Sequence, residues 1–230
     1  MTQPADGRDA MLGDIRRALG REASAHTVDA GRRPRQADHD AIERRYRRQD
    51  DATREAITDR FRQRLEGLGV RVLEAAGEAE VRGIIDQRLK ASAIGSVIVP
   101  PDLPGAWCPG DEGVSLITDD GHPAAAINDI DGVITGCRLA IAETGSIVLD
   151  AGPAQGRRLL TLMPDYHLCV IDAAQVVGLV PEAMTQLVET QRTCAPITFI
   201  TGPSATADIE LSRVAGVHGP RRLEVILLGG

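Results

Sequence analysis

Aromatic residues are scarce in this sequence, which has two phenylalanines, two tyrosines and one tryptophan among 230 residues. A hydrophobic core must therefore be built from Val, Ile, Leu and Ala. Proteins that bind single-stranded nucleic acids stack bases on aromatic side chains, so the composition argues against that class. The net charge of -7 also argues against nonspecific binding to DNA or phospholipid.

Long apolar runs and targeting signals are also missing. No stretch approaches the roughly 20 apolar residues that a membrane-spanning helix needs. The N-terminus lacks the basic segment followed by an apolar segment that is typical of a secretory signal. We therefore expect a cytoplasmic protein with no membrane span.

Closely spaced cysteines are absent as well. The four cysteines, Cys108, Cys137, Cys169 and Cys194, lie far apart in the sequence. Zinc and iron–sulfur sites typically use cysteines two to four residues apart, so we expect no cofactor and no metal in this chain. Isolated thiols in a cytoplasmic protein are typically reduced and buried.

The N-terminal part of the chain differs from the rest. Residues 8–20 have the apolar spacing of a short amphipathic helix, and residues 21–40 are polar and resemble a linker. Residues 40–67 are strongly charged and contain one apolar helical stripe. We predict an N-terminal arm over 1–50 and an α/β domain over 51–230. The charged segment is either a docking arm or a solvated helical flank, and we favour the flank.

Candidate strands and helices alternate from residue 70 onward. This alternation predicts an α/β fold: a layered, mainly parallel sheet flanked by helices. The expected strands cover residues 70–73, 96–100, 114–117, 137–143, 147–149, 167–171, 198–200 and 223–228, and the expected helices cover 78–89 and 181–190.

The loop that follows the apolar run 196–200 has features of a ligand site. Gly202 permits backbone angles that other residues avoid, and Ser204 can cap a following helix. The start of a helix has free N–H groups that attract anions. The hydroxyl groups of Thr201, Ser204 and Thr206 would add further donors.

Two acids, Asp208 and Glu210, come next, and they would repel a bare phosphate. They also suit the positive end of a helix, so a capped strand-to-helix turn is an alternative explanation. No lysine follows this glycine, so the loop is not a Walker A motif. We interpret the loop as a ligand site that suits hydroxyl or protonated groups.

A second stretch, AIAETGSIVL, has an acid inside an apolar run. Glu143 is either exposed in a tight hairpin turn at Thr144 and Gly145, or it lies at a strand end in apolar surroundings. In the second case its pKa would be raised, and it could act as an acid, base or nucleophile oriented by Ser146.

Two further residues are candidates. His218 lies in a Gly/Pro loop, where a turn or core role is expected more than metal ligation, because no zinc-binding His pattern supports it. A ligand-facing role is the alternative, because loops after parallel strands gather at sites. Arg157 can offer a guanidinium to a carboxylate or phosphate, unless it faces water.

These stretches, in this order, resemble the LUD-domain family, in particular its YkgG-like subgroup, lactate utilisation protein C. The matching text is AIAETGSIVLDAG, GRRLLTLMPDYHLCVI and ITGPSATADIELSRVAGVHGPRRLEVILL. The resemblance implies a fold similar to ribose-5-phosphate isomerase and CoA transferases. It also implies a role in oxidising L-lactate to pyruvate with two iron–sulfur partner proteins, which would hold the clusters. The family-motif positions are Glu143, Thr144, Gly145, Ser146, Thr201, Gly202, Ser204, Thr206, Asp208, Glu210 and His218.

Three hypotheses follow. In the first, the protein is a subunit or accessory factor of an L-lactate-oxidising system. Glu143, the 201–208 loop and His218 then line one pocket at the carboxyl ends of the strands. Glu143 or His218 takes a proton from a small hydroxy acid, and the loop or Arg157 holds its carboxylate. In the second, it is a stand-alone acyl- or CoA-transferase-like or sugar-phosphate enzyme with Glu143 as nucleophile. In the third, it is a non-catalytic assembly module that docks through its N-terminal arm.

Overall fold

The computed structural model describes Met11, Glu43 and residues 45–189, 196–207, 213–215 and 219–229. The chain divides into two units, Met1–Tyr46 and Arg47–Gly230, and the fold below is that of the second unit. The predicted helix at 8–20, apart from Met11, and the predicted linker lie outside the described residues. Among the described residues, no helix is long and apolar enough to cross a membrane.

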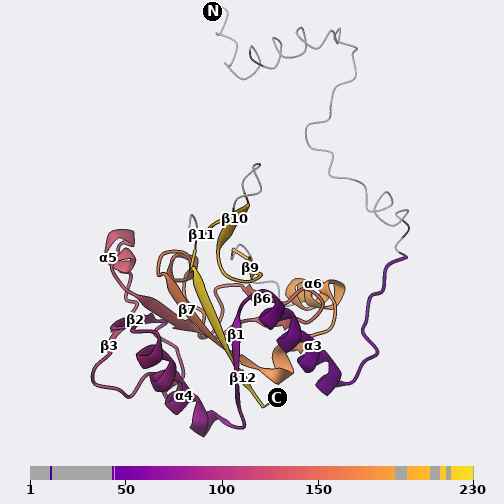
Figure 1. Cartoon of the computed structure of the whole chain (residues 1–230). Coiled ribbons are helices and arrows are strands. Elements are labelled where there is room, and N and C mark those ends of the chain that lie inside the picture. Colours follow the sequence, from indigo (N-terminus) through magenta and orange to yellow (C-terminus); the bar gives the residue numbers. More distant parts are fainter. Residues whose placement is uncertain are drawn as a thin grey trace, which may run out of the picture. The chain divides into compact units, whose positions relative to one another are not determined.

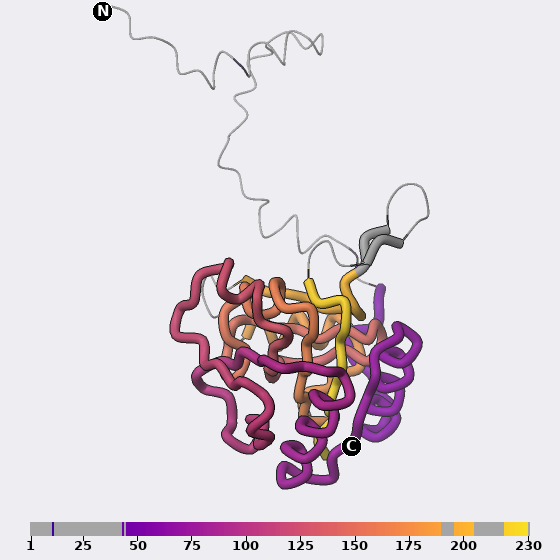
Figure 2. The backbone as a smooth tube through the Cα atoms, turned by 60° about the vertical axis from the view of Figure 1, so that its left-hand side comes forward, coloured from indigo at the N-terminus to yellow at the C-terminus, as the bar shows by residue number. Residues whose placement is uncertain are grey.

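Six strands form the main sheet, in the order β1-β12-β7-β4-β2-β3, and every neighbouring pair is parallel. This confirms the predicted α/β class. The yellow C-terminal strand passes through the middle of the domain (Figure 2). The strands are β1 (Arg71–Ala75), β2 (Ser96–Val99), β3 (Ser115–Thr118), β4 (Gly132–Thr135), β7 (Tyr166–Asp172) and β12 (Arg222–Leu228).

A second sheet of four strands has the order β8-β5-β6-β9, and β6 is antiparallel to both of its neighbours. The strands of this second sheet are β5 (Leu139–Ile141), β6 (Ser146–Leu149), β8 (Val176–Val177) and β9 (Thr198–Ile200).

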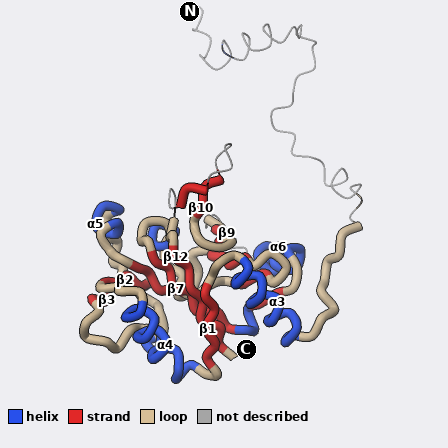
Figure 3. Tube along the Cα trace, viewed as in Figure 1, coloured by secondary structure: helices blue, strands red, loops and turns tan. Residues whose placement is uncertain are grey.

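Helices lie around the strands of both sheets (Figure 3). The α-helices are α3 (Arg54–Gly67), α4 (Glu78–Ala91), α5 (Ala124–Asn128) and α6 (Val180–Glu189), and the 3-10 helices are η1 (Gly105–Trp107), η2 (Arg158–Thr161) and η3 (Ala173–Gln175).

The central strands of the main sheet are buried on both faces, because side chains alternate in direction along a strand and other elements cover each face. On β7, Leu168 and Val170 join the core that includes α4. Cys169 and Ile171 point the other way, into the core that α3 and the second sheet share. Figure 1 shows α3 and α4 on either side of β1. Helix α6 packs against β5 and β6 of the second sheet.

The predicted helix after Ser204 is wrong. Strand β10 (Ala205–Ala207) follows instead, and it pairs antiparallel with β11 (Arg213–Ala215). The backbone of Thr206 pairs with that of Val214, and both residues are of the β-branched type that is more common in strands than in helices. The anion site expected from a helix start is therefore not formed at this loop.

Candidate functional site

The loop after β9 borders a cavity of about 290 Å³, which we call the hydroxyl cavity. It reaches His167 and Leu223, the second residues of β7 and β12. The cavity therefore lies at the amino ends of these parallel strands, whereas we predicted a pocket at their carboxyl ends. It is lined by Thr161, Leu162, His167, residues 198–204, Gly219, Pro220 and Leu223.

His167 is the most informative residue of this lining. It is fully buried, and its Nε2 lies 2.8 Å from Thr135 Oγ1. Its other ring nitrogen, Nδ1, is buried and has no hydrogen-bond partner among the described residues. A buried polar atom without a partner is uncommon in a folded protein and calls for an explanation.

Behind His167, polar groups continue into the core. Thr135 Oγ1 donates to Cys169 Sγ at 4.0 Å, and Cys169 Sγ lies 3.6 Å from the carbonyl oxygen of Gly136. Cys137 is also buried, as predicted for these thiols. A hydrogen bond between the two thiols lowers the pKa of Cys169 and raises the pKa of Cys137, and burial raises the pKa of Cys137 further.

Hydroxyl groups join two of the predicted stretches at the hydroxyl cavity. Thr144 Oγ1 donates to Ser146 Oγ at 2.8 Å, and Ser146 Oγ lies 2.7 Å from Thr201 Oγ1. Ser146 is buried, and Thr201 lines the hydroxyl cavity. The structure thus connects the AETGS turn to the TGPS loop through side chains that we predicted would lie near one another.

Two glycines position these loops against the end of α3. Gly145 and Gly202 have φ angles of +67° and +84°, which residues with side chains rarely adopt. A Cβ atom on Gly145 would lie 3.2 Å from Leu68 Cδ1, and one on Gly202 would lie 3.3 Å from Leu68 Cβ. Both loops therefore pack on Leu68, which explains why glycine occupies each position.

Glu143 lies on the exposed side of this arrangement. It belongs to the β5–β6 turn, and its backbone N–H donates to the Gly178 carbonyl oxygen at 3.0 Å. Its side chain is solvent-exposed and is not part of the lining of the hydroxyl cavity. The structure therefore matches the alternative in which Glu143 is exposed in a hairpin turn.

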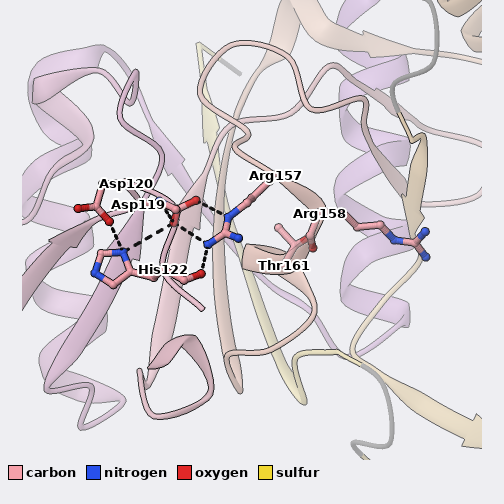
Figure 4. Close-up of polar contacts among 7 residues, drawn as sticks. Asp119, Asp120, His122, Arg157, Arg158 and Thr161 are labelled. Atoms are coloured by element: carbon pink, nitrogen blue, oxygen red, sulfur yellow. Dashed lines mark hydrogen bonds and ion pairs between the residues drawn. The ribbon is translucent and has the colours of Figure 1, made fainter. Parts of the chain in front are cut away.

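Arg157 binds a carboxylate of the chain itself. Its Nε lies 2.7 Å from Asp119 Oδ2 and its terminal nitrogen 2.8 Å from Asp119 Oδ1, and it also donates to the carbonyl oxygen of His122. This pairing holds the pKa of Asp119 below its usual value. In Figure 4 the side chain of Arg158 points away from this pair. Arg158 is exposed and lines a small pocket that shares Thr161 and Thr198 with the hydroxyl cavity.

The other predicted positions are described in part or not at all. Ser204 lines the hydroxyl cavity, and only the backbone of Thr206 is described. Asp208, Glu210 and His218 lie outside the described residues. No group of three or more His, Cys, Asp or Glu in the described part of the chain is arranged to hold a metal ion. The absence of a cofactor in this chain stays a prediction.

Sequence reasoning missed His167 and Thr161 as cavity residues. The signal for His167 was present, because it is one polar residue inside the apolar run YHLCVI. We assigned that run to a strand and gave its histidine no role. Thr161 precedes β7 and carries no comparable signal.

The chain is similar to a known domain family and to named proteins. The LUD domain model matches residues 118–228. Lactate utilization protein C of Deinococcus radiodurans is 40% identical over 181 residues, which cover 77% of this chain and 82% of that protein. Its namesake in Geobacillus thermodenitrificans is 30% identical over 171 residues, which cover 65% and 69%.

A solved structure is also similar. The crystal structure of a DUF162 family protein from Deinococcus radiodurans has a TM-score of 0.65 and 34% identity, over 77% of this chain and 99% of that one. With 40% identity to a relative of which it covers 82%, the chain belongs to the LUD domain family.

Proposed function

We propose that this protein is a cytoplasmic component of a bacterial lactate-utilization system, in which it binds a small 2-hydroxy or 2-oxo carboxylate in the hydroxyl cavity. The relatives named lactate utilization protein C support the first part. The second part depends on one observation. His167 lines the hydroxyl cavity, and its buried Nδ1 has no partner among the described residues.

Nδ1 is buried, so a ligand would satisfy it only by displacing part of the lining that covers it. An unmet buried polar group costs about 1–3 kcal/mol, so a ligand that supplies the missing hydrogen bond gains that amount. The volume of about 290 Å³ lies at the lower limit of ligand pockets, which favours a small molecule. Exposed Arg158, beside the cavity wall at Thr161, is placed to attract a carboxylate.

The redox chemistry is proposed to lie elsewhere in the system. Iron–sulfur proteins would carry the electrons, and this chain would bind or position the acid. The catalytic roles predicted for Glu143 and His218 stay predictions. The exposed position of Glu143, outside the cavity lining, favours a ligand contact by His167 instead.

The test combines growth with binding. A strain that lacks the gene should fail to grow on L-lactate but grow normally on glucose. Wild type and His122→Gln should restore growth, because His122 lies outside the lining of the hydroxyl cavity. His167→Gln and Thr201→Val should restore growth on L-lactate poorly, and thermal melts of the variants confirm that they fold.

A deletion strain that grows normally on lactate rejects the first part of the proposal. Calorimetry that detects neither L-lactate nor pyruvate binding rejects the second.

A further inference from the structure

We propose that the outer edge of β9 is a dimer interface, at which two copies of this chain join their second sheets across a twofold axis. In this contact β9 of one copy pairs antiparallel with β9 of the other. The contact needs no ligand, so it can be tested independently of the function proposed above. Four apolar side chains, each 44–59% exposed, flank this edge, and we call them the β9 patch: Met184, Val188, Ile197 and Phe199.

The two edges of the second sheet differ. At one edge the chain itself closes β8, because Arg54 donates to the carbonyl oxygen of Val176 at 2.7 Å. At the other edge, within the described part of the chain, β9 pairs with β6 alone. Natural proteins often protect an edge strand with a charged residue, but the three residues of β9 are Thr, Phe and Ile. β9 is therefore the edge of this sheet at which a further strand can pair.

The neighbouring strands fix the direction of the peptide groups of β9. The carbonyl oxygen of Val148 accepts from the N–H of Arg138, next to β5, at 2.8 Å, so Val148 directs its peptide groups toward β5. Hydrogen-bonded and non-hydrogen-bonded pairs alternate along antiparallel strands, so Val148 does not bond to Phe199, which lies opposite it on β9. The N–H and carbonyl groups of Phe199 therefore point away from β6. Neither group has a hydrogen-bond partner among the described residues.

The side chain of Phe199 extends the apolar face that α6 covers. Side chains of directly opposed residues lie on the same face of a sheet, and Val148 packs with Ala183 and Leu187 of α6. Phe199 shares this face but remains exposed, as does Ile197 two residues earlier. The apolar face of the second sheet is therefore incompletely covered at the β9 edge.

Helix α6 adds two apolar side chains on the side nearest β9. Its residues Glu182, Thr185 and Gln186 line a pocket beside β8, at the opposite edge of the sheet. Successive residues of a helix are rotated by about 100°, so Met184 and Val188 lie on the other side of α6. The β9 patch thus spans α6 and β9.

The geometry of this edge favours a second copy as the occupant. Phe199 is the middle residue of β9 and offers one donor and one acceptor. A twofold axis beside Phe199 would let the two copies exchange both hydrogen bonds, as in a hydrogen-bonded antiparallel pair. Pro196 and Pro203 lie beyond the ends of β9, and their missing N–H groups limit the pairing to a short stretch. The β9 patch would meet its own copy without repulsion, because none of its side chains is charged.

The first experiment is sedimentation velocity of the full-length protein over a range of concentrations. We expect the wild type to sediment as two chains. Phe199→Lys and Val188→Lys place like charges across the axis, and each should shift the protein to a single chain. Leu116→Lys is the matched control, because Leu116 is a 42% exposed apolar residue on the edge strand β3, and it should remain a dimer. Thermal melts confirm that the variants fold.

Two outcomes of this experiment would overturn the proposal. If the wild type stays a single chain at every concentration, the β9 patch serves a different partner. If both Phe199→Lys and Val188→Lys remain dimers, the contact between copies lies elsewhere. Val188 is outside the lining of the hydroxyl cavity, so its variant tests the interface without altering that site.

The second experiment locates the axis. Hydrogen-bonded residues of an antiparallel pair have Cα atoms about 5.5 Å apart, a separation that a disulfide can span. Phe199→Cys should therefore form a covalent dimer under mild oxidation, and a reductant should reverse it. The wild type, which has four cysteines of its own, and Leu116→Cys are the controls and should form little. If Phe199→Cys forms no more covalent dimer than these controls, the axis does not lie at β9 and the proposal fails.

Discussion

Ser146 Oγ and Thr201 Oγ1 lie 2.7 Å apart, although 55 residues separate them in the chain. The contact ties the first hairpin of the second sheet to the loop that lines the hydroxyl cavity. Thr144 extends it by one more hydroxyl group, at 2.8 Å. Three side chains from two separate motifs therefore act as one unit.

Removing the hydroxyl group of Ser146 or of Thr201 should lower the free energy of unfolding. Removing both should lower it by less than the sum of the two separate effects. We expect Ser146→Ala and Thr201→Val each to lower the free energy of unfolding by about 1 kcal/mol. The double variant should reveal a coupling of about 0.5–1 kcal/mol in urea denaturation. Thr118→Val, at an exposed position on β3, serves as the control and should change stability by less than about 0.5 kcal/mol. Strictly additive effects would contradict a shared hydrogen bond.

Gly202→Ala should destabilise the protein and weaken ligand binding together. The φ of +84° costs an alanine about 1–2 kcal/mol, and its Cβ would lie 3.3 Å from Leu68 Cβ. Gly83→Ala is the matched control, because Gly83 lies inside α4 with open space around it. That change should stabilise the helix by about 0.5–1 kcal/mol. Thermal melts and calorimetry measure both effects, and an undisturbed Gly202→Ala protein would argue against a fixed loop.

The two adjacent arginines should respond differently to the same substitution. Arg157→Gln leaves buried Asp119 without its partner and should cost about 2 kcal/mol of stability. Arg158→Gln should leave the melting temperature unchanged and lower the affinity for a carboxylate ligand. If Arg158→Gln binds lactate as tightly as the wild type, Arg158 has no role in carboxylate binding.

Acid should destabilise the protein partly through Asp119. Its pKa in the folded state is lowered from 3.8 by Arg157, so its contribution is complete above the unfolded value and is lost as the pH falls through the folded one. We expect the free energy of unfolding to decrease below about pH 5. Asp119→Asn should be less stable than the wild type at pH 7, and the two should converge in acid. Parallel pH curves would show that Asp119 contributes nothing to this dependence.

Glu143→Gln should leave lactate binding unchanged, because Glu143 is exposed and lies outside the lining of the hydroxyl cavity. Calorimetry on the variant and growth of the complemented strain both measure this. Loss of growth with binding retained would assign Glu143 a role outside the cavity, as an acid, a base or a partner contact.

The regular elements were predictable wherever the apolar pattern was long. Helix α4 and strands β7 and β12 lie within two residues of their expected ends. Strand β4 was missed because it is short and begins at a glycine. A Cβ on Gly132 would lie 2.9 Å from Tyr166 Cδ1, so packing against Tyr166 requires a glycine here. The strand propensity of the local sequence does not account for this residue.

The site was harder to predict than the fold. The motifs at 143–146 and 201–204 drew attention by composition, and hydroxyl contacts do connect them. His167 contacts Thr135 on the neighbouring strand β4, and Thr135 also contacts Cys169 of the strand that holds His167, an arrangement that no local pattern reveals. Arg157 was predicted to bind a ligand because nothing near it in the sequence could pair with its charge. Its partner, Asp119, lies 38 residues away in the sequence.

The place of β12 in the sheet has a consequence for synthesis on the ribosome. Its partners β1 and β7 are both made earlier, yet β12 lies between them. Until residues 222–228 emerge, β1 has an open edge and the hydroxyl cavity lacks Leu223. An unpaired strand edge can associate with other chains, so the nascent protein is exposed to aggregation until β12 pairs with β1 and β7.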